Sequence, residues 1–377
     1  MRADRPAGRV ERAGLGALIA ALRSRGFRVV GPTVRDGHLV HADLESDADL
    51  PAGWRDVQEA GRYRLERSDD PAVFGHNVGP VSWKQWLFAD PQVLVRWRRD
   101  GAGWHVVEPA AEPSPPLALF GARACDVAAI AIQDRVLSHG EHADAHYAAQ
   151  RRDAFVVAVD CGHAGGTCFC ASAGTGPAAS SGYDLALTEV VAPGQHWFLV
   201  RSGSERGAEV LAGVPHRQAT GEEVAQATAI VERTAASMGR SIDMPGARET
   251  LLAAVDSPHW DEVAQRCLSC GNCTMVCPTC FCTSVEDAAA LDGSSAERVR
   301  VWDTCFAASH SYIHGGSVRN GTPARYRQWI THKLATWVDQ FGTNGCTGCG
   351  RCITWCPVGI DITHEVAALQ AATEETA

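Results

Sequence analysis

Two runs of cysteines in the last third of the sequence have the residue type and the spacing of metal ligands. Each run follows the pattern C-x2-C-x2-C-x3-C and is followed directly by a proline. The two runs consist of Cys267, Cys270, Cys273, Cys277 and of Cys346, Cys349, Cys352, Cys356. This is the bacterial run whose thiolates hold [4Fe–4S] clusters, so the spacing predicts two such clusters.

The fourth cysteine of each run is predicted to bind the cluster of the other run. Three cysteines at intervals of three wrap one face of a cube, and the short loop cannot enclose the rest. One predicted ligand group, called the first set, is Cys267, Cys270, Cys273 and Cys356. The other, called the second set, is Cys346, Cys349, Cys352 and Cys277. Crossed ligation brings the two clusters close together, and closeness suits electron transfer.

Four cysteines in the N-terminal half form a third set, Cys125, Cys161, Cys168 and Cys170. Cys125 follows a predicted strand at Leu117–Phe120, and Cys161 follows another at Phe155–Val159. Loops after neighbouring strands can converge, so four thiolates there could surround a third cluster. The alternative is a group of buried or free thiols, a common fate for cysteine. We favour the third cluster, as an addition to the two predicted from the runs.

Three cysteines belong to no complete group: Cys280, Cys282 and Cys305. Three thiolates are one ligand short of a cluster, although His310 or His314 would complete a site. Cys280 also competes with the nearby Cys277 for the position of fourth ligand. Packing beside the clusters is the interpretation that we favour over a separate metal.

Zinc sites and disulfides are the two alternative explanations for these cysteines. Zinc sites usually show paired C-x2-C knuckles, not two runs of four that each end in Cys-Pro. The chain has 15 cysteines, but they cluster at metal-ligand spacings, and no export signal is evident. The apolar stretch Ala13–Leu22 lacks a small-residue cleavage site and is better explained as an amphipathic helix. Thiolates that must stay reduced predict a cytoplasmic location.

Composition and the missing motifs exclude several classes of function. The net charge of −10 and the pI of about 5.8 argue against nucleic acid as the main partner, which needs a basic surface. The sequence has no apolar run of the roughly 18 residues that a transmembrane helix requires. No Walker motif, G-x-S-x-G elbow or H-E-x-x-H helix is present. Gly174–Ala179 formally matches G-x-G-x-x-A, but no strand precedes it, so a dinucleotide site is not expected.

The elements that must position these cysteines predict an α+β fold. Eight short apolar or alternating runs predict strands: Val29–Val34, Leu39–Leu44, Val93–Trp97, Trp104–Val107, Leu117–Phe120, Phe155–Val159, Leu185–Val190 and Trp197–Val200. Helical spacing is found at Val127–Leu137 and later at Glu222–Met238, Arg325–Gln340 and Ile362–Ala372. The Pro-rich segment Glu108–Pro116 is expected to be a loop.

These patterns predict two domains. Residues 1–216 are expected to form a β-rich α+β domain that contains the third set. Strand signals disappear from about Gly221, so residues 217–377 are expected to form a mostly helical, ferredoxin-like domain with both cysteine runs.

Seven segments together resemble one known family, the β subunits of cytoplasmic NAD(P)-linked [NiFe] hydrogenases, also called sulfhydrogenases. These segments are Phe120–Asp126, Cys168–Cys170, Cys273–Cys282, Leu291–Gly293, Trp302–Cys305, His314–Gly316 and Gly345–Pro357. The combination is specific, whereas the cysteine runs alone are generic. The electron-transfer subunit of anaerobic sulfite reductases is similar in the same places, so the resemblance does not separate the two.

The resemblance implies an electron-transfer subunit without catalytic residues of its own. In the hydrogenase family, such a subunit is associated with a flavin subunit that handles NAD(P)H and with the small and large hydrogenase subunits. The absence of a nucleotide-binding fingerprint here is consistent with that division of labour. The alternative is the same relay in a sulfite reductase complex. A redox or iron sensor is a third hypothesis, and the acidic charge argues against the DNA-binding module that it would need.

Overall fold

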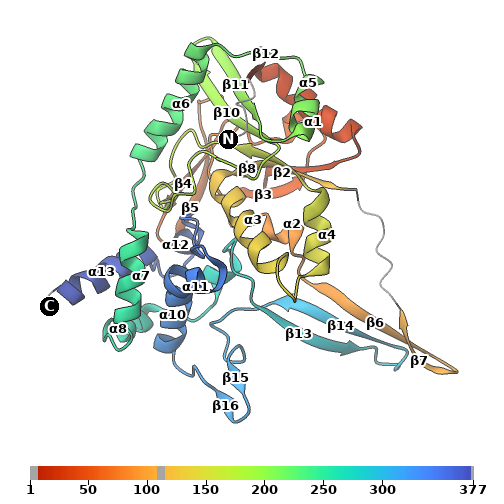
Figure 1. Cartoon of the computed structure of the whole chain (residues 1–377), viewed down its shortest axis with the longest axis vertical. Coiled ribbons are helices and arrows are strands. Elements are labelled where there is room, and N and C mark those ends of the chain that lie inside the picture. The colour runs from red at the N-terminus through yellow and green to blue at the C-terminus, as the bar shows by residue number, and fades with distance from the viewer. Residues whose placement is uncertain (1–6, 108–114, 375–377) are drawn as a thin grey trace.

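Among the described residues, the main sheet has eight strands, and the third set lies near the carboxyl ends of two of its central strands. The structure is a computed structural model that describes residues 7–107 and 115–374 (Figure 1). In spatial order the strands are β12 (Arg217–Gln218), β1 (Gly8–Glu11), β11 (Gln195–Ser202), β10 (Leu185–Ala192), β9 (Phe155–Val159), β8 (Leu117–Arg123), β2 (Arg28–Arg35) and β3 (His38–Asp43). The four strands β10, β9, β8 and β2 are parallel, and the strands outside them pair antiparallel.

Helices cover both faces of this sheet. One face carries α1 (Leu15–Ser24) and α5 (Glu205–Ala212), and the other carries α3 (Ala124–Leu137) and α4 (Ala145–Asp153). Strands β8 and β9 are therefore buried along their whole length, as parallel strands between two helical layers are. The predicted amphipathic helix is confirmed, because α1 buries Leu15, Leu18, Ile19 and Leu22.

The cysteine runs lie among helices in the C-terminal part. These helices are α6 (Gly221–Ala236), α7 (Met244–Ala253), α8 (His259–Arg266), α9 (Asn272–Met275), α10 (Thr322–Thr331), α11 (Trp337–Phe341), α12 (Arg351–Thr354) and α13 (Ile362–Glu374). A π-helical turn, η3 (His332–Thr336), joins α10 to α11. Their shared core includes Trp260, Tyr326, Trp329 and Leu334. The predicted α+β class is confirmed, with helices and sheets both well represented.

A second sheet contradicts one prediction made for the C-terminal part. Strands β13 (Thr283–Ala289) and β14 (Ser295–Trp302) form a hairpin, although the sequence pattern predicts no strand after Gly221. The hairpin pairs with β6 (Gln92–Asp100), which in turn pairs with β7 (Gly103–Val107) (Figure 1). Most residues of β13 are exposed, so backbone pairing and not apolar burial defines it. Since this sheet joins both halves of the chain, the boundary at residue 216 stays a prediction.

The remaining elements are short. They are the hairpins β4 (Trp54–Glu59) with β5 (Arg62–Arg67) and β15 (Tyr312–Ile313) with β16 (Gly316–Ser317), helix α2 (Lys84–Leu87), and the 3-10 turns η1 (Arg12–Gly14) and η2 (Asp47–Asp49). Residues 108–114 of the predicted Pro-rich loop lie outside the described residues. Within the described ranges, none of the helices has the length and apolar character needed to cross a bilayer.

Candidate metal centres

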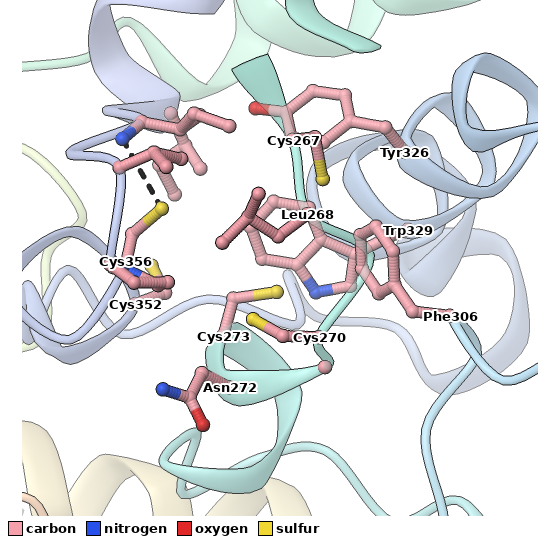
Figure 2. A pocket seen from close by; sticks show the side chains of 15 residues that line it. Cys267, Leu268, Cys270, Asn272, Cys273, Phe306, Tyr326, Trp329, Cys352 and Cys356 are labelled. Carbon is pink, nitrogen blue, oxygen red and sulfur yellow. Dashed lines mark hydrogen bonds between the residues drawn. The ribbon is translucent and has the colours of Figure 1, made fainter. Parts of the chain in front are cut away.

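The first set surrounds a single cavity. Its four cysteines, Cys267, Cys270, Cys273 and Cys356, all line a hollow with about 420 Å³ of empty space, part of it open to solvent. In Figure 2, Cys267, Cys270 and Cys273 lie together, and Cys356 faces them from across the cavity beside Cys352. The remaining wall is mostly apolar and includes Leu268, Phe306 and Trp329. Four thiols around an apolar space are the donor set that a [4Fe–4S] cluster requires.

Each cysteine run forms the same short loop followed by one turn of helix. In the first run, Gly271 has φ +75° and directly precedes α9, and in the second run, Gly350 has the same φ and directly precedes α12. Backbone N–H groups point at the sulfurs, since Ser269 N donates to Cys267 Sγ at 3.4 Å and Gly348 N donates to Cys346 Sγ at 3.4 Å. Such N–H···S bonds are one of the means by which a protein sets the reduction potential of a cluster.

The second set is gathered more deeply inside the chain. Cys277, Cys346 and Cys349 are buried, and Cys352 is half-buried. Burial raises the pKa of the Cys352 thiol well above its ordinary value, and the sulfurs of Cys346, Cys349 and Cys277 raise it further. The four side chains are therefore close electrostatic neighbours, although they come from both runs.

The first and second sets are adjacent. Cys352 of the second set also lines the first-set cavity (Figure 2). Cys356 lies with the cysteines of the first run, and Cys277 neighbours those of the second run. This proximity is what the predicted exchange of fourth cysteines requires, and the exchange itself remains a proposal.

The third set lines a cavity of its own, with about 290 Å³ of empty space. Cys125, Cys161, Cys168 and Cys170 all contribute to its wall. Cys125 lies at the start of α3 directly after β8, and Cys161 follows β9, so the cavity is at the carboxyl ends of parallel strands. Ligand sites in sheets with parallel strands are commonly found at this edge. Burial raises the pKa of the Cys168 thiol to about 12, so an empty site holds a neutral thiol and a bound metal must displace its proton.

The third and second sets are also adjacent. The thiol of Cys168 donates to the carbonyl oxygen of Cys349 at 3.9 Å. Cys125, Cys170 and Cys349 pack in one small buried cluster. A Cβ on Gly348 would lie 2.7 Å from the Cα of Cys170, so the glycine permits this close approach of the two segments. The three sets follow one another in space, with the second set in the middle.

The remaining cysteines pack beside the predicted ligands. A hydrogen bond from Cys280 and the ammonium of Lys333 lower the pKa of the Cys277 thiol, against the effect of burial. Cys305 is an electrostatic neighbour of both Cys273 and Cys282. His310 and His314 are exposed. Among the described residues, no group of three or more His, Cys, Asp and Glu side chains is arranged to hold a single metal ion.

Sequence reasoning missed two buried cations in the segments that form the second set. Lys333 is 2% exposed, and its Nζ donates to Cys277 Sγ at 3.2 Å. Arg351 is 1% exposed, pairs with Asp126 at 2.9 Å and donates to the carbonyl oxygen of Gly79 at 3.1 Å. The available signal was the position of Lys333 at helical spacing from Trp329, Ile330 and Trp337, between the two runs.

Comparison with known proteins identifies the family. Residues 266–360, which include both cysteine runs, match the family model described as a 4Fe-4S dicluster domain. The sulfhydrogenase 2 subunit beta of Pyrococcus furiosus is 34% identical to this chain over 246 residues, which cover 64% of this chain and 71% of the relative. No solved structure is significantly similar to the chain. The resemblance inferred from the sequence is confirmed, and the chain belongs to the family of sulfhydrogenase β subunits.

Proposed function

We propose that the chain relays single electrons between partner subunits through two [4Fe–4S] clusters, bound by the first and second sets, and a third, bound by the third set. The observation that carries the proposal is the adjacency of the three sets. Cys352 borders the first-set cavity, and Cys349 contacts the third set through Cys168. A single structural metal would not need twelve thiols arranged in three neighbouring groups.

In this proposal, the chain's own residues bind the clusters, hold them apart and shield them from water. A bound [4Fe–4S] cluster supplies one-electron redox chemistry. The four thiolates of each set fix the position of the cluster that they bind. In the first and second sets, the two cysteine runs exchange their fourth cysteines. Phe306, Tyr326 and Trp329 keep water from much of the first-set cavity. No residue of the chain is assigned a catalytic role in this proposal.

The two ends of this row are accessible from outside. At one end Cys270 is exposed, and the neighbouring Leu268 is 63% exposed. At the other end His163 lines both the third-set cavity and an open cavity with about 920 Å³ of empty space. Arg55 and Arg233 line that open cavity as well. Electrons can therefore enter near one end and leave near the other.

We propose as partners a flavin subunit that handles NAD(P)H and the small and large subunits of a [NiFe] hydrogenase, in one hetero-oligomer. Membership in the sulfhydrogenase β family supports this choice. A cytoplasmic location follows from a partner that uses NAD(P)H. The same relay in a sulfite reductase complex is the competing assignment.

Two measurements test the proposal. Iron and sulfide per polypeptide on anaerobically prepared protein should give about twelve of each, since each cluster holds four irons. About eight would remove the third cluster from the proposal, and none would refute the relay. Purification from the native host should yield nickel-containing hydrogenase subunits. Recovery with a sirohaem subunit would instead assign the chain to sulfite reduction, and recovery of the chain alone would contradict the partners.

A further inference from the structure

We propose that Lys333 raises the reduction potential of the cluster bound by the second set above that of the cluster bound by the first set. This inference rests on the proposed function, because it assumes that both sets bind clusters. On this inference, the second-set cluster, in the middle of the relay, is reduced more readily than the first-set cluster. The contacts, burial and charges around Lys333 support it.

Lys333 has three hydrogen-bond acceptors and almost no contact with solvent. Its Nζ donates to Cys277 Sγ at 3.2 Å, to Thr279 Oγ1 at 3.0 Å and to the carbonyl oxygen of Gly345 at 3.1 Å. An ammonium group has three N–H donors, so each acceptor receives one, whereas a neutral amine has only two. The geometry is therefore that of a charged lysine, in direct contact with a predicted cluster ligand.

No carboxylate in the described part of the chain neutralises this charge. Among the described residues, none of the ion pairs includes Lys333. A buried ammonium without an anion is very unfavourable, because burial removes its hydration. The anionic candidates around Nζ are the sulfurs of Cys277 and Cys346, both of the second set, and that of Cys280. A negatively charged cluster at the second set would supply the missing counter-charge.

The backbone presents Lys333 to both cysteine runs at once. It lies in the π-helical turn η3, and such turns are rare and frequent at functional sites. Gly345 N donates to the carbonyl oxygen of Lys333 at 2.9 Å, while the Lys333 side chain reaches back to the oxygen of Gly345. Gly345 precedes Cys346, and Thr279 follows Cys277, so Lys333 joins the ends of the two runs that build the second set.

The first set has no comparable cation among the residues that the structure describes. None of the described side chains that line its cavity is charged. The nearby Arg266 is paired with Glu365 at 2.8 Å, so its charge is offset. Reduction adds negative charge to a cluster, and a buried positive charge in contact with a ligand stabilises that state. The difference in surroundings therefore favours the electron on the second set.

The test is a potentiometric titration followed by EPR on the anaerobic full chain, comparing wild type with K333M. Coulomb attraction at this range is strong enough that the reduction equilibrium of one cluster should become about tenfold less favourable or worse. Tenfold corresponds to about 59 mV for a one-electron couple. The signal that moves should be the one lost in Cys346→Ser, and the other signals should keep their potentials. K333R, which retains the charge, should stay close to wild type.

Lys84 offers a matched control. It is also buried, but its Nζ donates to the carbonyl oxygen of Cys280 at 3.1 Å and lies over the Trp302 ring, not against a predicted ligand. K84M should therefore shift the same potential by less than K333M does. An equal or larger shift in K84M would overturn the specific role of Lys333.

The outcomes separate this inference from the proposed function. Wild-type chain without iron would refute the relay itself. Wild-type chain with its full iron but unchanged potentials in K333M would overturn only the inference. If K333M loses iron, K333Q makes the same comparison with a polar group in place. Loss of about four irons in both variants would show that Lys333 is needed for assembly, and would equally overturn its role in setting the potential.

Discussion

The first and second sets are built from the same sequence pattern and lie in opposite surroundings. The first-set cavity has an apolar wall, and one of its cysteines, Cys270, is exposed. Three of the four cysteines of the second set are buried, the buried Lys333 contacts its Cys277, and the buried Arg351 lies in the chain between its Cys349 and Cys352. Identical loops therefore fix which atoms bind, while the elements packed around them decide charge and access. Two copies of one motif can in this way serve unequal roles in one chain.

Removing a ligand between the two sets should have the largest effect. Cys352→Ser takes one thiolate from the second set at the side chain that also borders the first-set cavity. We expect the second-set cluster to be lost or converted, with up to about four irons missing and the first cluster electronically isolated. Iron analysis and EPR of the reduced variant measure this.

Cys282→Ser is the matched control for Cys352→Ser. Cys282 is a half-buried cysteine outside the three sets, so the control variant should keep its full iron content. An unchanged spectrum and iron content in Cys352→Ser would contradict the assignment of this ligand.

Air should distinguish the two sets by their exposure. Oxidation of cysteine follows accessibility, and Cys270 is exposed whereas Cys277, Cys346 and Cys349 are buried. During brief exposure to air, the EPR signal of the first-set cluster should decay several-fold faster than that of the second. Faster decay of the second-set signal would contradict the difference in access. A sample kept anaerobic for the same time is the control.

Breaking the Asp126–Arg351 pair should destabilise the surroundings of the second set. Both side chains are buried, so Asp126→Asn would leave the Arg351 guanidinium without its carboxylate. Removing one member of a buried pair typically costs about 3–5 kcal/mol of unfolding free energy. Anaerobic denaturant unfolding of the variant and the wild type measures the loss. A change under about 1 kcal/mol would show that the pair does not anchor this region.

An exposed pair should matter least. Arg298 contacts Asp287 at 2.7 Å across the β13–β14 hairpin, and its hydrogen bond lowers the pKa of Asp287. Because the pKa of Asp287 is lower in the folded chain than in the unfolded chain, the pair stabilises the folded chain at a pH above the unfolded-state pKa. This stabilisation is lost as the pH falls through the folded-state pKa. Because both side chains are exposed, this contribution is small, and Asp287→Asn should leave the midpoint of unfolding nearly unchanged at neutral pH. A large change in the midpoint at pH 7 would show that this pair contributes more to stability than its exposure predicts.

Apolar patterning predicted the main sheet well. Runs such as Leu117–Phe120 and Phe155–Val159 are strands in the structure because both faces of β8 and β9 are buried. The hairpins β4–β5 and β13–β14 were missed, because their exposed residues carry a weak apolar signal and pairing with other segments defines them. Patterning reports burial, and these strands are set by their pairing partners.

The candidate site, like the fold, was predicted only in part from the sequence. Spacing alone indicated the crossed grouping of Cys277 and Cys356, because the motif itself encodes the loop. It gave no indication that Lys333 would contact Cys277, or that Gly348 would pack against Cys170, since both contacts depend on how distant segments fold together. The chemistry of the ligands was local information, and the chemistry of their environment was not.

The second sheet, β13-β14-β6-β7, has a consequence for biogenesis. Strand β6 pairs with β14 in a register that places Arg96 opposite Glu297. The sheet around β6 therefore cannot be completed until β14, which is translated much later, has been synthesised. The proposed exchange of fourth cysteines has the same effect, because Cys356 lies far downstream of the other three cysteines of the first set. In the proposed ligation, iron–sulfur insertion into the first set must therefore follow synthesis of both cysteine runs.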